Sequence, residues 1–154
     1  MLIIVQSMRE LAFGRLMEVY QEPSGLVSLR AEQEFYHYLN DCFFRTPGAV
    51  YCIWQEGQRY VSALRLEPYN DGRLLTALQT APDCRGNGYA GSLVRAVLAW
   101  QKAYGGGKIY SHIENRNAPS IAVHVECGFR KISDHAVYLD GSVDCRSGTY
   151  IYEC

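Results

Sequence analysis

The residues with the clearest chemical meaning form a glycine-rich stretch in the middle of the chain. Gly86, Gly88 and Gly91 follow a strand-like apolar run and precede a strongly helical pattern. Glycines let backbone amides crowd together, and the start of a helix adds unpaired N–H groups and the positive end of the helix dipole. Such a turn suits a phosphate or diphosphate. The glycines alone fit a tight strand-to-helix turn without a ligand equally well.

A second ligand class competes for the same glycines. Gly86-x-Gly88-x-x-Gly91 matches the dinucleotide fingerprint, and Glu114 lies at about the right distance downstream for its ribose acid. In that fingerprint the strand runs almost directly into the first glycine, whereas Pro82 and the three residues after it intervene here. The turn signals before the stretch also favour an antiparallel sheet. A Rossmann-like nucleotide-binding protein is therefore the second interpretation.

Composition limits the classes of protein that could carry this stretch. The chain has 154 residues, 48% of them hydrophobic and 20% charged, with a formal net charge of −1. This excludes a disordered chain, and it argues against a protein that binds nucleic acid by general electrostatic attraction. No apolar run reaches the roughly 18 residues of a membrane span. We expect one domain over residues 1–154, a cytoplasmic location, and neither nucleic acid nor membrane as a partner.

Cysteine and histidine spacing gives no sign of a disulfide framework or a metal site. The six cysteines form no Cys-x-x-Cys pair, and Cys42 and Cys52 lie in apolar surroundings that favour buried free thiols. The histidines are scattered along the chain. They are His37, His112, His124 and His135. We expect reduced thiols and no metal.

In the first third of the chain, the pattern predicts a strand followed by two helices. Leu2–Val5 fits a short strand, and Ser7–Glu10 fits a capping box that opens a helix ending near Pro23. A second helix is expected after Ser28, ending at residues 46–48. Several aromatic residues in and after this region could wall a pocket, although a core role is the more common one. They are Tyr36, Tyr38, Phe43, Phe44 and Tyr69.

The rest of the chain alternates between strand and helix patterns. The predicted strands are Ala49–Trp54, Tyr60–Glu67, Leu74–Ala81, Ile109–Glu114, Phe129–Leu139 and Thr149–Tyr152. A long helix carries apolar residues at helical spacing from Ala90 to Leu98, and a short helix covers Asn117–Cys127. This order predicts an α+β fold with mostly antiparallel strands. The one strand–helix–strand crossover, Leu74–Glu114, makes its two strands parallel.

Two motifs together resemble the GNAT superfamily of N-acetyltransferases. Arg85-Gly86-Asn87-Gly88-Tyr89-Ala90 fits that family's acetyl-CoA signature: Arg or Gln, two residues, Gly, one residue, then Gly or Ala. Residues 117–129 resemble the next motif of the family, Asn-x-x-Ser followed by an apolar helix face and Gly-Phe. The order of elements from Leu2 to Tyr152 is also similar to the family's fold.

The resemblance implies a particular sheet and a cofactor site. The sheet would be mixed and mostly antiparallel, with six to seven strands, helices on both faces and a splayed parallel pair at its centre. The pantetheine arm of acetyl-CoA would lie in the gap of that pair, and the glycine loop would hold the diphosphate. The residues implied are Leu78, Gln79, Thr80, Arg85, Gly86, Asn87, Gly88, Tyr89, Ala90, Asn117 and Ser120. Asn117 also lies where an N-cap belongs.

The resemblance also points to groups that could move protons. His124 stands where the family commonly carries a tyrosine that protonates the departing CoA thiolate, so an imidazole would have to do this here. The alternative is a half-buried histidine with a packing role only. Glu67 and Glu114, each near a strand end, are candidates for the base that deprotonates an incoming ammonium. Each could equally be a solvated surface carboxylate.

These inferences predict an acyltransferase of the GNAT type that needs no metal. It would move an acetyl group from acetyl-CoA to a primary amine of a small molecule or peptide by direct attack on the thioester. The alternatives are a non-catalytic acyl-CoA-binding module of the same fold and the Rossmann-like protein. The sequence does not identify the amine acceptor, and it is compatible with both a monomer and a homodimer.

Overall fold

A seven-stranded sheet with helices on both faces dominates the computed structural model, which describes residues 1–21 and 28–154. The strands are β1 (Leu2–Val5), β2 (Val50–Glu56), β3 (Arg59–Tyr69), β4 (Gly72–Thr80), β5 (Lys108–Glu114), β6 (Arg130–Ser133), β7 (Ala136–Val137), β8 (Val143–Asp144) and β9 (Ser147–Glu153). The helices are α1 (Phe13–Val19), α2 (Leu29–Tyr38), the π-helix η1 (Leu39–Phe43), the 3-10 helix η2 (Pro82–Cys84), α3 (Tyr89–Ala103) and α4 (Ala118–Glu126).

The order of strands across the sheet is β1-β2-β3-β4-β5-β9-β6, while β7 and β8 form a separate two-stranded sheet. Every neighbouring pair in the large sheet is antiparallel except β4 and β5, which are joined through α3. The predicted α+β fold, the strand count and the central parallel pair are therefore confirmed.

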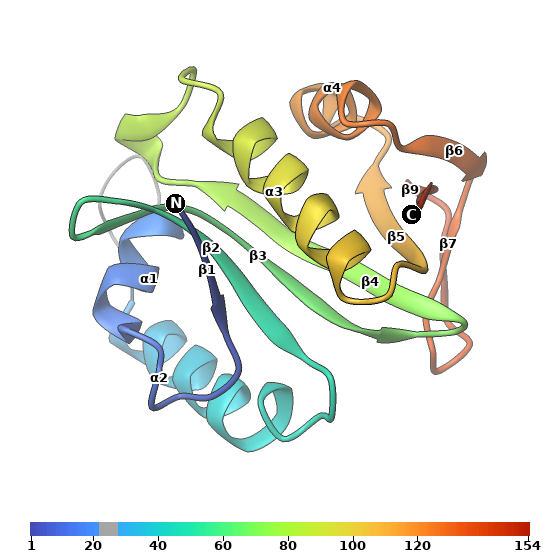
Figure 1. Ribbon diagram of the computed structural model, residues 1–154. Coiled ribbons are helices and arrows are strands. Elements are labelled where there is room, and N and C mark those ends of the chain that lie inside the picture. The colour runs from blue at the N-terminus through green and yellow to red at the C-terminus, as the bar shows by residue number, and fades with distance from the viewer. Residues whose placement is uncertain (22–27) are drawn as a thin grey trace.

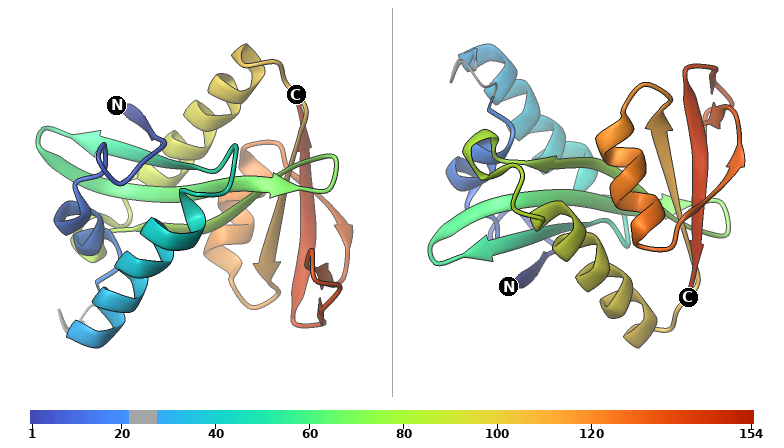
Figure 2. Two further views of the ribbon diagram at one scale, coloured as in Figure 1. Left: turned by 90° about the horizontal axis from the view of Figure 1, so that it is seen from below. Right: turned by 90° about the horizontal axis from the view of Figure 1, so that it is seen from above.

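Each face of the sheet carries its own apolar core. Figure 1 shows α3 and α4 on one face and α1 with α2 on the other, and the two views of Figure 2 show these faces in turn. Leu93, Val94 and Val97 of α3 are fully buried against one face, as their helical spacing predicts. Leu16 and Val19 of α1 pack with Tyr51 on the other. Strand β3 is buried on both faces, and β4 pairs with it.

Two predicted elements differ in the structure. Ser7–Glu10 forms an isolated turn, in which the Ser7 hydroxyl bonds the Glu10 carboxylate at 3.3 Å, and α1 begins only at Phe13. The backbone amide of Glu10 donates to Ser7 O at 3.2 Å, so these residues close a turn instead of capping a helix. The predicted end of this helix at Pro23 lies outside the described residues. Phe129–Leu139 is not one strand, because a turn after Ser133 moves β7 away from β9 and onto β8.

The cysteines are all free thiols, and one of them lies in an environment that differs from the expected one. All six cysteines lie in described segments and are unpaired. Cys52 is buried, but Cys42 is exposed on the π-helix, so its apolar neighbours in sequence gave the wrong environment. No helix among the described residues is long and apolar enough to cross a membrane.

Candidate active site

The central parallel strands separate halfway along their length. Strands β4 and β5 pair from Gly72 and Lys108 only as far as Leu75 and Ser111, although both continue beyond. The backbone of β4 after Leu75 therefore faces β5 without a ladder partner there. Such a free strand edge can bind an extended ligand that carries amide groups.

A bulge in β4 lies in this separated part. Opposite β3, Ala63 aligns with Gln79 but Arg65 with Thr76, so β4 has one residue more than β3 between those positions. Ala77 has a positive φ of 55°, which is uncommon for a residue other than glycine. A bulge redirects the strand and its peptide groups at this point. The sequence carried no signal for it.

A cleft of about 670 Å³ runs from the free edge of β4 to the start of α3. It is lined by Leu78, Gln79, Thr80, Cys84, Arg85, Gly86, Gly88, Tyr89, Ala90, Gly91, Asn117, Pro119, Ser120 and Val123. The structure thus brings together every cofactor-binding residue expected from the sequence except Asn87. The Asn87 amide instead donates to the carbonyls of Cys84 and Arg85, at 3.0 and 3.3 Å, and shapes the loop from outside the cleft.

The glycine loop presents backbone donors to this cleft. Gly86 and Gly88 have φ values of 79° and 78°, and neither would place a Cβ within 4 Å of another atom. The first hydrogen bond of α3 runs from Ser92 N to Gly88 O, so the amides of the preceding turn have no acceptor within the helix. These amides and the helix dipole together favour an anion at this end of the cleft.

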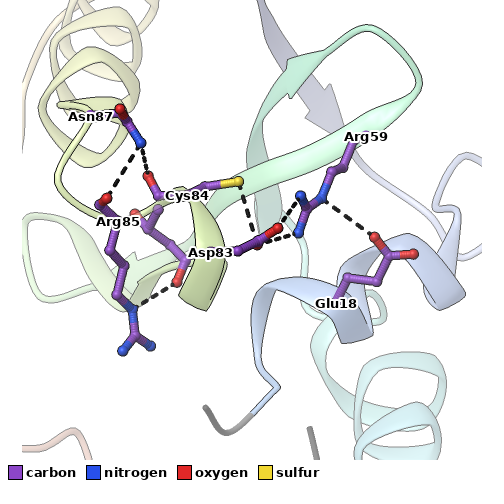
Figure 3. Close-up of polar contacts among 7 residues, drawn as sticks. Glu18, Arg59, Asp83, Cys84, Arg85 and Asn87 are labelled. Carbon is purple, nitrogen blue, oxygen red and sulfur yellow. Dashed lines mark hydrogen bonds and ion pairs between the residues drawn. The ribbon is translucent and has the colours of Figure 1, made fainter.

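Ion pairs fasten the segment that leads into the loop. Asp83 accepts two hydrogen bonds from the Arg59 guanidinium, at 2.7 and 2.6 Å, and Arg59 also lies 3.6 Å from the Glu18 carboxylate (Figure 3). These bonds from Arg59 lower the pKa of Asp83 to about 2, so the pair persists across the physiological pH range. The loop is thereby tied to β3 and, through Glu18, to α1. The Arg85 side chain donates to Thr80 O at 3.2 Å within the loop itself.

His124 lies behind the wall of the cleft and is only 1% exposed. Its Nδ1 lies 2.7 Å from the Ser120 carbonyl, which can only accept, so Nδ1 carries a hydrogen. Its Nε2 lies 3.0 Å from the Ser111 hydroxyl, which donates to a neutral ring. Burial lowers the pKa of His124. In this arrangement the ring is neutral and joins α4 to β5 at the last β4–β5 pair.

Asn117 and Ser120 occupy the first turn of α4. The Asn117 side chain accepts from Ser120 N at 3.2 Å and caps the helix, in agreement with the expected N-cap. Both residues also line the cleft. Capping fixes the orientation of the Asn117 side chain at the edge of the cleft.

The two carboxylates considered as bases lie apart from each other. Glu67 is half-buried on β3, two residues beyond Arg65 on the same face of the sheet. Glu114 is exposed and borders a separate hollow with Asn115, Arg116 and Arg146. Neither carboxylate lines the large cleft.

His112 is a candidate that no motif in the sequence marks. It is the first residue of β5 beyond the paired segment, and its ring packs against Tyr69 and Tyr138 with centroids 5.4 and 4.9 Å away. Both ring nitrogens are buried without a hydrogen-bond partner among the described residues. Burial lowers the pKa of His112, while Asp144 opposes that shift. The His112 side chain lies on the opposite face of β5 from Ser111, and no periodic pattern in the sequence distinguishes it.

A family model described as "Acetyltransferase (GNAT) family" matches residues 13–129, about three quarters of the chain. The chain belongs to the GNAT acetyltransferase family. The resemblance noted in the motifs is therefore confirmed, and the assignment as an acyltransferase agrees with it. Among curated proteins, none is significantly similar to the chain in sequence.

Solved structures of the family share the fold at low sequence identity. A spermidine N-acetyltransferase chimera that includes Vibrio cholerae sequence is 16% identical with a TM-score of 0.71, covering 99% of this chain and 95% of that one. A PaiA N-acetyltransferase from Thermoplasma acidophilum, in complex with coenzyme A, is 12% identical with a TM-score of 0.69 over 100% and 99% of the two chains. A ribosomal-protein-alanine N-acetyltransferase from Brucella melitensis is 16% identical with a TM-score of 0.68, over 99% of both chains.

This GNAT protein has a second cavity, of about 440 Å³, on the α1–α2 side of β4. It is lined by Met17, Tyr20, Ala31, Glu32, Phe35, Tyr51, Arg65, Ala77, Leu78 and Gln79. Leu78 and Gln79 line both cavities, so only the bulged part of β4 lies between them. The aromatic residues expected to wall a pocket do not line this one; Tyr20, Phe35 and Tyr51 do.

Proposed function

We propose that the protein transfers an acetyl group from acetyl-CoA to an amine by direct attack on the thioester. One observation carries this proposal: the free edge of β4 and the amides at the start of α3 line a single continuous cleft. The ligand that suits this cleft is long, with amide groups along one part and a diphosphate at the other. Acetyl-CoA has this chemistry, and NAD lacks the amide-bearing arm.

The residues present fit the two parts of such a ligand. The unpaired backbone of Leu78–Thr80 would hydrogen-bond the pantetheine amides, as an added strand would. The amides of Arg85–Ala90 would hold the diphosphate, helped by the α3 dipole. Asn117 and Ser120 close the cleft from the α4 side. Binding at these places would leave the thioester near the bulge in β4.

The chain then has to bring an amine to this point and manage two protons. When bound, acetyl-CoA supplies an activated acyl group that a neutral amine attacks without a covalent enzyme intermediate. Holding the two reactants together supplies a large part of the acceleration. The second cavity opens on the opposite side of the same bulge and would admit the amine.

We assign the protonation of the leaving thiolate to His124 in its protonated form, through its bonded neighbour Ser111. The imidazolium would give its Nε2 proton to Ser111 Oγ while the Ser111 hydroxyl gives its own proton to the thiolate, which leaves His124 neutral. Ser111 Oγ lies 3.0 Å from His124 Nε2 and 3.5 Å from the Leu75 carbonyl. The hydroxyl can donate to the ring when the imidazole is neutral, and to Leu75 O when Nε2 carries a proton. The site therefore accommodates both protonation states of His124 at the position where the strands part.

For the proton of an incoming ammonium, we assign His112 as acceptor ahead of Glu67 and Glu114. Its ring lies on the opposite face of β5 from Ser111 and is neutral near pH 7 because burial lowers its pKa. A neutral imidazole has one ring nitrogen that can accept a proton, and neither His112 nitrogen is bonded to another described residue. Glu67 is on the same side of the sheet and is the alternative; Glu114 borders a separate hollow.

Two assays test the proposed function together. Thermal denaturation with acetyl-CoA, dephospho-CoA and NAD measures which ligand binds the native state, since selective binding raises the melting temperature. Thiol release with a panel of amines measures turnover. We expect stabilisation by acetyl-CoA but not NAD, and thiol release with at least one amine. Stabilisation by NAD alone would favour the Rossmann-like alternative, and acetyl-CoA binding without turnover would favour a non-catalytic acyl-CoA-binding module.

A further inference from the structure

The cavity on the α1–α2 side of β4 contains an arginine that has no acidic partner among residues 1–21 and 28–154. Arg65 is half-buried on β3, and its cross-strand neighbours are Tyr51 of β2 and Thr76 of β4. Among the described residues, no carboxylate forms an ion pair with it and no acceptor takes a hydrogen bond from it. Arg59, by contrast, is paired with acids on two sides. Within the described part of the chain, the Arg65 donors are therefore not used and line a cavity where a ligand could use them.

Aromatic rings fix the position of this guanidinium. Its Cζ lies 5.2 Å from the ring centre of Tyr38, 5.7 Å from Phe43 and 5.9 Å from Phe35. Cation–π contacts of this kind hold the planar group in place but leave its edge N–H donors unused. A rigid fork of donors is the geometry that binds a carboxylate through two parallel hydrogen bonds.

The charge of Arg65 also acts on the floor of the cavity. The Tyr20 hydroxyl donates to the carbonyl of the bulge residue Ala77 at 2.9 Å and accepts from Tyr51 at 2.6 Å. Burial raises the pKa of Tyr20 to about 12, and the positive charge of Arg65 opposes this shift. The guanidinium therefore lies close enough to influence the hydroxyl that contacts the bulge.

We propose that Arg65 binds a carboxylate of the acceptor, so that the acceptor is a small amino acid-like molecule with an amine and a carboxylate. This rests on the proposed function, because it names the substrate class of the same site. A polyamine would bring positive charge against an unpaired guanidinium, which is unfavourable in a half-buried cavity. Glu32, the one acid among the lining residues, is also half-buried but makes no ion pair with Arg65 among the described residues.

The test compares acceptors that differ only in the carboxylate. The standard amino acids are assayed for thiol release as free acids and as primary amides, with the wild type, Arg65→Gln and Arg65→Lys. We expect at least one free acid to be preferred over its amide by the wild type. Arg65→Gln should lower kcat/KM for that acid by roughly 10- to 100-fold, the factor that follows from losing a charge-assisted hydrogen bond. It should leave the amide nearly unchanged, and Arg65→Lys should keep part of the preference.

Arg73→Gln is the matched control. Arg73 is a half-buried arginine on β4, stacked 5.4 Å from the Trp100 ring and outside the lining of both cavities. Its replacement also removes a cation–π contact, so it should change the melting temperature but not the preference for free acids. Thermal denaturation of all variants verifies that each still folds.

A second readout does not depend on turnover. The N-acetyl form of each amino acid is titrated calorimetrically into the CoA-loaded protein, and Arg65→Gln should bind the preferred one at least tenfold more weakly. Equal use of acids and amides by the wild type, or an equal loss for both in Arg65→Gln, would overturn the proposal. Failure of the proposed function would look different: no stabilisation by acetyl-CoA, and no thiol release with any amine, including polyamines and peptides.

Discussion

Two histidines flank β5 where it leaves β4, one on each face. His124 bonds Ser111 on the α4 side, and His112 packs between Tyr69 and Tyr138 on the other. The two imidazole rings differ in their hydrogen bonds. His124 is held by hydrogen bonds at both nitrogens, whereas His112 has none from the described residues. An acid facing the cofactor side and a base facing the acceptor side would fit this division.

His124→Phe should lower kcat roughly 10- to 1,000-fold while the KM for acetyl-CoA changes little, because a proton donor acts in the transition state. Steady-state thiol release measures both constants. His124→Tyr should restore part of the loss, since a phenol keeps its proton to higher pH. Normal turnover by the phenylalanine variant, with chemistry as the slow step, would leave His124 a packing role only.

His112→Asn should lower kcat at least about tenfold, because it removes the group that accepts the ammonium proton. The affinity for acetyl-CoA, measured by calorimetry, should not change, since His112 does not line the cofactor cleft. Glu67→Gln and Glu114→Gln serve as comparisons. A full kcat in His112→Asn combined with a large loss in Glu67→Gln would transfer the role of base to Glu67.

The sequence predicts the site residues that belong to motifs and misses those that do not. Arg85–Ala90 and Asn117 could be placed because their types and spacing are fixed by what the backbone does there. His112 and Arg65 lie inside ordinary strand patterns, and only the pairing of strands shows which face and which neighbours each has. The burial and the hydrogen bonds of His124 could likewise not be predicted, because helix periodicity does not show whether a ring nitrogen has a partner.

Among the elements, β4 does most to create the site. It pairs with β3 along its length but with β5 over only its first half. The bulge at Ala77 lies in the second half, where β4 has β3 as its only pairing neighbour among the described strands. The sequence predicted the strand, the crossover and the helix α3, because apolar periodicity reports these directly. It did not predict the bulge, since alanine carries no signal for a positive φ. It misassigned Ser7–Glu10, because a capping motif is local and does not show whether a helix follows.

For the whole molecule, we expect the two buried histidines to make stability depend on pH. Burial lowers the pKa of His112 and His124 below the ordinary value near 6.5. The unfolded chain therefore binds more protons than the native one below that value, so stability is full above it and falls as the pH drops toward the lowered pKa values. Denaturant unfolding at pH 7 and pH 5 measures this loss.

The double variant His112→Asn, His124→Gln should lose less stability than the wild type between these two pH values. The exposed histidines provide the control, and His37→Gln with His135→Gln should keep the wild-type dependence. An unchanged pH dependence in the double variant would show that other groups cause it.

The overall arrangement places two cavities on opposite sides of one strand segment. The cleft at the glycine loop and the cavity at Arg65 share Leu78 and Gln79, and the ion pairs of Arg59 tie the loop to α1. The central parallel pair that produces this geometry followed from the sequence pattern and the family resemblance. The lining of the cavity at Arg65 did not, because it depends on how α1 and α2 pack across β2 and β3.

Calorimetric titration of acetyl-CoA into the wild type, Gly88→Val and Gly57→Val tests whether the glycine loop forms part of the cofactor site. Gly88 and Gly57 have φ values of 78° and 59°, and a Cβ would meet no atom within 4 Å at either, so both variants carry similar backbone strain. Only Gly88 lines the cleft. We predict that the wild type and Gly57→Val bind with similar affinity and that Gly88→Val binds at least several-fold more weakly. No binding by the wild type, or equal affinity in all three proteins, would contradict the account.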